Sequence, residues 1–72
     1  MEQSKISIAL IGGGCWGQHL VRDFNKIGAL DTICEINNTL LEKYKLLYPD
    51  IKLTSDFNSV LSNSKITAVC VA

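Results

Sequence analysis

The feature that most constrains the fold is a glycine-rich turn between an apolar segment and an amphipathic one. Gly12, Gly14 and Gly17 satisfy the spacing G-x-G-x-x-G directly after the largely apolar segment 5–11. Such a match is weak in isolation, but it becomes informative between a strand and a helix. In that setting Gly12 makes a tight turn, Gly14 lets a diphosphate approach the backbone, and Gly17 lets the helix pack close to the strand.

The turn predicts an anion site that is built from the backbone. A helix start has unpaired N–H groups and a partial positive charge, so it binds a diphosphate without a lysine. We expect the amides of Gly14, Cys15 and Trp16 to face that anion. An NTPase P-loop is excluded because Gln18 and His19 stand where Lys and Ser/Thr are required.

An acidic residue after the second apolar segment completes the pattern of a dinucleotide site. Glu35 lies 21 residues after Gly14, close to the spacing of about 20 at which a carboxylate accepts the ribose hydroxyls of an adenosine. Its charge would repel a 2′-phosphate, and neither Ile36 nor Asn37 supplies a guanidinium. The residues therefore favour NAD over NADP, with Ile36 and Asn37 lining the adenine side.

Several alternatives remain open at this point. The glycines could form a simple turn that binds nothing, and Glu35 could be a solvated strand end. FAD is the cofactor hardest to exclude, since flavoproteins often use a Glu at this place, although they usually have a small residue where Val21 stands. Trp16 could shield the diphosphate or staple the helix to the sheet, and His19 is expected at the surface rather than in catalysis.

The remaining pattern alternates strands and helices. Right-handed crossovers turn the order βαβαβαβ into a doubly wound parallel sheet with helices on both faces. With the last strand beside the first, the strand order is 3-2-1-4, and a crevice opens beyond the carboxyl ends of strands one and four. The predicted strands are residues 5–11, 30–36, 51–53 and 66–72.

The predicted helices are marked by caps and by apolar stripes. Gly28 ends the first helix as a left-handed cap. The second begins near Asn38 or Thr39, with a capping box over residues 39–42, and Ser55 or Asp56 caps the third. The apolar residues expected to face the core are Leu20, Phe24 and Ile27, then Leu40, Leu41, Tyr44, Leu47 and Tyr48, then Phe57, Val60 and Leu61.

Composition excludes other classes of partner. Seven Lys and Arg balance seven Asp and Glu among 72 residues, so no surplus positive charge can neutralise a nucleic acid or an anionic membrane. No apolar run approaches the 18–20 residues of a membrane span. The three cysteines form no Cys-x-x-Cys pair, so we expect no metal site and reduced thiols in a cytoplasmic protein.

The chain is expected to be a truncated domain. Its sequence ends inside an apolar strand, and a naked strand of that kind invites pairing with another chain. We therefore interpret residues 1–72 as the N-terminal part of a dinucleotide-binding domain, with the rest of that domain and a substrate domain absent. The full-length protein is expected to be a homo-oligomer.

Six segments distributed over nearly the whole chain form a further pattern: residues 5–11, the turn 12–17, and residues 20–24, 32–37, 54–57 and 66–72. In these segments the sequence resembles the amino terminus of the Gfo/Idh/MocA family of oxidoreductases. Glu35 replaces the Asp that is more common in the family's Asp-x-Asn strand end.

The resemblance implies a Rossmann-like domain that holds NAD or NADP for hydride transfer to or from a sugar, nucleotide sugar or polyol. It implies that Val71 and Ala72 border the cofactor. The family's catalytic Glu-Lys-Pro lysine has no counterpart within residues 1–72, so no catalytic residue is assigned. The alternative is a non-enzymatic NAD-sensing module of the same fold.

Overall fold

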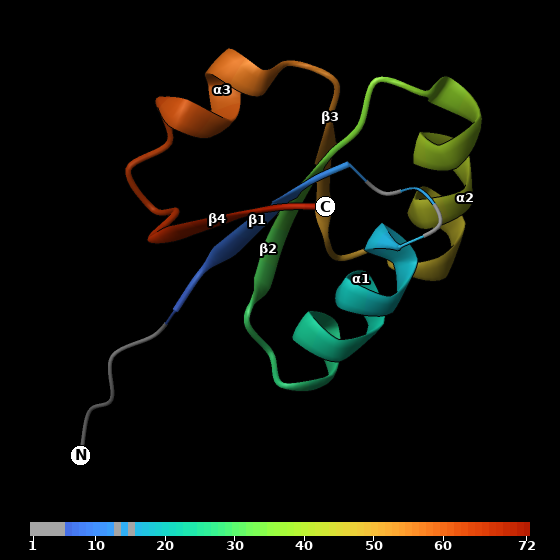
Figure 1. Cartoon of the computed structure of the whole chain (residues 1–72), viewed down its shortest axis with the longest axis horizontal. Helices are drawn as coiled ribbons and strands as arrows, with labels where there is room; N and C mark the ends of the chain where they lie inside the picture. The colour runs from blue at the N-terminus through green and yellow to red at the C-terminus, as the bar shows by residue number, and fades with distance from the viewer. Residues whose placement is uncertain (1–5, 13, 15) are drawn as a thin grey trace.

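The computed structural model describes residues 6–12, 14 and 16–72 as four strands and three helices (Figure 1). All strand pairs are parallel, and their order is β3-β2-β1-β4. This confirms the predicted order of elements and of strands. The elements are β1 (Ile8–Ile11), α1 (Gly17–Lys26), β2 (Leu30–Cys34), α2 (Asn38–Leu47), β3 (Lys52–Thr54), α3 (Phe57–Leu61) and β4 (Ala68–Val71).

Strands β1, β2 and β4 are shorter than predicted, whereas β3 has the predicted length but lies one residue later in the chain. β1 begins at Ile8 rather than at residue 5, which lies outside the described residues, and β4 covers only Ala68–Val71. β2 ends at Cys34, and β3 begins one residue later than predicted, at Lys52. Apolar character continues beyond the backbone pairing at these ends, so hydropathy alone overestimates the length of a strand.

Helices cover both faces of the sheet, because the side chains of a strand alternate between its faces. Leu10 and Ile33 pack with Val21 of α1 and Tyr44 of α2. Their neighbours Ala9 and Cys34 form a second core with other residues, which include Val60 of α3. Figure 1 shows the strands between α3 on one side and α1 with α2 on the other.

The helix signals are partly confirmed. Gly28 has a φ of +74°, the left-handed conformation predicted for it, and Asp56 caps α3 by accepting a hydrogen bond from the amide of Asn58 at 2.9 Å. The capping box at Thr39 is wrong. The cap of α2 is Asn37, whose Oδ1 accepts a hydrogen bond from the amide of Leu40 at 3.1 Å. The cap therefore lies two residues before the predicted box and satisfies the amide of Leu40 rather than that of Glu42.

The core is smaller than the apolar stripes predict. Tyr44 is fully buried, and Phe24 and Tyr48 pack partly buried against the first core. The helices are amphipathic as expected, but this sheet covers only part of each stripe. Four residues expected in the core are exposed: Ile27, Leu47, Phe57 and Leu61.

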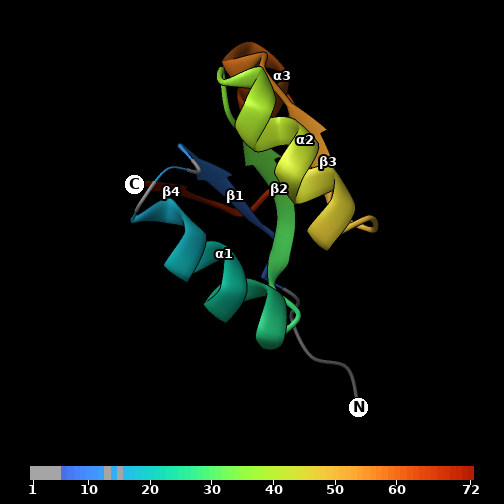
Figure 2. The ribbon, with the colours of Figure 1, turned by 90° about the vertical axis from the view of Figure 1, so that its right-hand side faces the viewer.

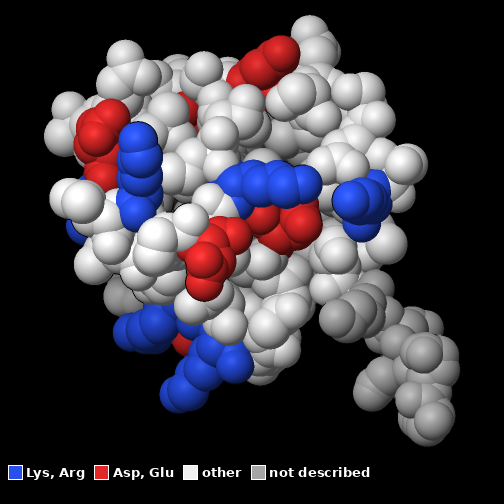
Figure 3. Space-filling model, turned by 180° about the vertical axis from the view of Figure 1, so that it is seen from behind, with Lys and Arg blue, Asp and Glu red and all other residues white. Residues whose placement is uncertain are grey.

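The surface shows no separation of charge on the face seen in Figure 3, where acidic and basic side chains are interspersed. Among the described residues, no helix is long and apolar enough to span a bilayer.

Candidate functional site

The first glycine of the motif occupies a backbone conformation that other residues rarely adopt. Gly12 follows β1 with a φ of +91°, as a tight turn requires. A Cβ at this position would lie 3.2 Å from the carbonyl oxygen of Ala72. The Gly12 amide donates a hydrogen bond to the carbonyl of Cys34 at 2.8 Å. The Ala72 amide donates a hydrogen bond to the carbonyl of Ile11 at 2.9 Å. The turn is therefore tied to the ends of both β2 and β4.

The last glycine of the motif allows the helix to approach the turn. A Cβ on Gly17 would overlap the carbonyl oxygen of Gly12 and would lie 3.5 Å from the Cβ of Ala72. Any side chain at Gly17 would push α1 away from the ends of β1 and β4. Figure 2 shows the C-terminus of the chain beside the start of α1. The close packing predicted for this glycine is confirmed.

The middle glycine faces open space. A Cβ on Gly14 would meet no atom within 4 Å. A hollow of about 250 Å³ lies here, at the carboxyl ends of β1 and β4, where the crevice was predicted. The residues that line it are Gly12, Gly14, Trp16, Gly17 and Ala72.

The start of α1 has neither a side-chain cap nor an acidic residue. Trp16 occupies the N-cap position, its side chain forms no capping hydrogen bond, and the first turn contains no acidic residue. The Trp16 side chain is 71% exposed, so it does not staple the helix to the sheet. Its ring lies edge-on to that of His19, with centroids 5.8 Å apart, and His19 is exposed as expected. Cys15, predicted at the anion, lies outside the described residues.

Glu35 is buried beside the turn. It directly follows Cys34, whose carbonyl accepts the Gly12 amide, and its own amide donates to the carbonyl of Thr54 at 2.9 Å. Only 8% of its surface is exposed, which contradicts the alternative of a solvated strand end. Its Oε2 accepts a hydrogen bond from the amide of Asn37 at 2.9 Å. The carboxylate is thus held in place by the loop that follows it.

The other residues predicted at the site have different surroundings. Ile36 is exposed, next to Glu35. The Asn37 side chain caps α2 and so serves the helix. Val71 is exposed and does not line the hollow, whereas Ala72 does. The structure therefore brings Gly12, Gly14, Trp16, Gly17 and Ala72 together around one hollow, whereas Glu35 follows the neighbouring strand β2 and does not line that hollow.

Burial near Glu35 perturbs two titratable groups. The pKa of the Cys34 thiol is raised by burial, and secondarily by the carboxylates of Asp56 and Glu35. The pKa of Tyr44 is raised by burial first, then by Tyr48 and Glu35. Both groups are therefore neutral at pH 7.

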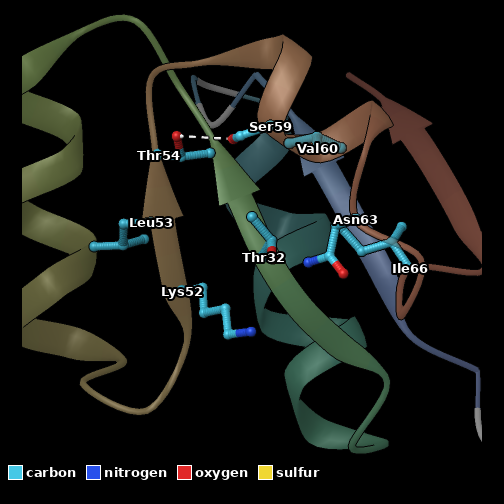
Figure 4. A pocket seen from close by; sticks show the side chains of 8 residues that line it. All are labelled: Thr32, Lys52, Leu53, Thr54, Ser59, Val60, Asn63 and Ile66. Atoms are coloured by element: carbon cyan, nitrogen blue, oxygen red, sulfur yellow. Dashed lines mark hydrogen bonds between the residues drawn. The ribbon is translucent and has the colours of Figure 1, made fainter.

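A larger hollow of about 400 Å³ lies on the α3 face of the sheet, between the β2–β3 pair and the α3 segment (Figure 4). The sequence reasoning missed it, because its polar residues are scattered along the chain and form no motif. Its lining residues are Thr32, Lys52, Leu53, Thr54, Ser59, Val60, Asn63 and Ile66. Within the described part of the chain, no group of His, Cys, Asp and Glu is arranged to hold a metal ion.

Comparison of the chain with protein-family models, curated proteins and solved structures found no match.

Proposed function

We propose that this chain forms the N-terminal dinucleotide-binding part of an NAD-dependent oxidoreductase with a Rossmann-like domain, acting on a sugar, nucleotide sugar or polyol. The observation that carries the proposal is the open hollow at Gly14, at the ends of β1 and β4, with Glu35 directly after the neighbouring strand β2. In open parallel sheets, ligands bind in such a crevice. The choice of substrate class rests on the family resemblance.

In this proposal the backbone holds the diphosphate. Gly14 presents no side chain toward the hollow, so a phosphate can come within hydrogen-bonding distance of the main chain there. The start of α1 adds its partial positive charge. Trp16 and Ala72 form the walls of the hollow and would exclude water from one side of the diphosphate.

Glu35 would bind the ribose of the adenosine. An ionised carboxylate accepts several hydrogen bonds, and the bond from the Asn37 amide orients it. Its negative charge would oppose a 2′-phosphate, so the proposal is for NAD rather than NADP. The cofactor would supply hydride transfer at its nicotinamide ring, whereas the residues of this chain would bind and orient it.

A substitution at Gly14 tests the proposal. In Gly14→Val, the new side chain points into free space, so the fold should remain intact while the approach of a diphosphate is blocked. Calorimetry with the full chain should show NAD binding that the variant weakens about tenfold or more, as expected for losing a charge-assisted hydrogen bond. Thermal unfolding of the variant controls for stability.

Two results would refute the proposal: no NAD binding by the unmodified chain, or equal affinity in Gly14→Val with an unchanged unfolding temperature.

A further inference from the structure

The hollow on the α3 face of the sheet contains hydrogen-bonding groups that the proposed dinucleotide site does not use. It shares no lining residue with the hollow at the glycine turn. Lys52 enters it from β3, and Asn63 enters it from the segment after α3 (Figure 4). Their side chains point into the same space from two different elements.

The hydroxyl protons around this hollow are used within the protein. Thr32 donates to Oδ2 of Asp31 at 2.7 Å, and Ser59 donates to the carbonyl of Asp56 at 2.7 Å. The hydrogen bond of 3.4 Å between Thr54 and Ser59 must therefore be donated by Thr54. A hydroxyl has one proton, so these three side chains have no proton left for a ligand.

The remaining donors belong to Lys52 and Asn63. The Oδ1 of Asn63 accepts a hydrogen bond from the amide of Lys65 at 2.9 Å, which fixes the orientation of its side-chain amide. Its NH₂ group then faces the hollow, as Figure 4 shows. Among the described residues, the Lys52 ammonium takes part in no ion pair, since the one pair present joins Arg22 and Asp23.

A site whose remaining groups are an ammonium and an amide NH₂ is complementary to an anionic acceptor. Val60, which is 2% exposed, and Ile66 add an apolar wall. We propose that this hollow binds a small organic acid, with its carboxylate between Lys52 and Asn63 and a short apolar part against Val60 and Ile66. A charge-assisted hydrogen bond of this kind is stronger than a neutral one.

Isobutyrate and acetate are suitable probes for an NMR titration of the full chain. We expect both to shift the amide signals of Thr32, Val60 and Asn63, and isobutyrate to bind more tightly because its methyl groups reach the apolar wall. Inorganic phosphate tests whether any anion suffices.

Two variants address the proposed donors directly. Lys52→Met should weaken isobutyrate binding about tenfold or more, whereas Lys45→Met, a matched lysine on α2 outside the hollow, should leave it unchanged. Asn63→Asp keeps the oxygen that accepts the Lys65 amide, so the turn is preserved while the NH₂ is replaced by a repelling charge. It should abolish the shifts.

Three results would overturn the proposal: no shifts at these residues, equal affinity in Lys52→Met, or phosphate binding at least as tightly as isobutyrate. None of them would bear on NAD binding at Gly14, because the two hollows are separate.

Discussion

At the residue scale, the candidate site depends on two glycines and on one buried carboxylate. Gly12 and Gly17 have backbone roles that no other residue type fills, because one needs a positive φ and the other lies against a carbonyl oxygen. The burial of Glu35 could not be predicted, since the sequence does not show how the chain folds around the end of β2, where the amide of Asn37 donates to this carboxylate.

Glu35 gives a prediction at this scale. Glu35→Ala should weaken NAD binding about tenfold, because the ribose loses a charged acceptor. It should also reduce the ratio of the affinity for NAD to that for NADP, because the repulsion of the 2′-phosphate is gone. Glu35→Gln is the control, because its side chain can still accept a hydrogen bond from the Asn37 amide but has no charge. It should also reduce the preference for NAD over NADP, with a smaller loss of stability than in Glu35→Ala. Calorimetry with both dinucleotides measures this, and an unchanged ratio of affinities in both variants would contradict it.

The Cys34 thiol predicts a loss of stability at alkaline pH. Its pKa is raised by folding, so the folded chain favours the neutral thiol. The resulting contribution to the stability of the fold is fully present below the ordinary pKa of 9.0 and is lost as pH rises through the raised pKa. The free energy of unfolding, measured by urea unfolding, should therefore fall as pH rises above 9.0, and it should fall less steeply in Cys34→Ala. Equal slopes in the two proteins would count against it.

At the scale of elements, the alternation of strands and helices was predictable because each helix has an apolar stripe and each strand an apolar run. The start of α2 was predicted less well. Both Asn37 and the box beginning at Thr39 are suitable caps by residue type, and the tertiary structure selects Asn37 by ending β2 at Cys34.

Alanine variants distinguish the two caps. Asn37→Ala should lower the free energy of unfolding by about 1 kcal/mol, because the Leu40 amide loses its acceptor. Thr39→Ala should have almost no effect, since Thr39 does not cap the helix. Urea unfolding monitored by circular dichroism measures both. A larger loss in Thr39→Ala than in Asn37→Ala would show that the predicted box is the true cap.

At the scale of the whole molecule, the strand order was predictable because crossover handedness and the position of the glycine turn leave few topologies. The extent of the core was not, since it depends on how much of each helix the small sheet covers. Val69 and Val71 on β4 are exposed at the edge of this sheet. Neither Lys nor Pro occurs in this strand to block pairing with another chain.

This edge predicts self-association. Sedimentation of the chain at increasing concentration should show growth in average mass, because unpaired strand groups and exposed valines favour pairing between copies. Val69→Lys should shift the distribution toward monomer, whereas Leu46→Lys, at an exposed position on α2, should change it less. A stable monomer at every concentration would contradict this expectation.

In the proposed function, the diphosphate of NAD lies against the backbone of the glycine turn. A crystal structure of the full chain with NAD would locate it. We expect density for the diphosphate in the hollow at Gly14 and for the adenosine ribose at the Glu35 carboxylate. Density for NAD elsewhere, with that hollow empty, would contradict it.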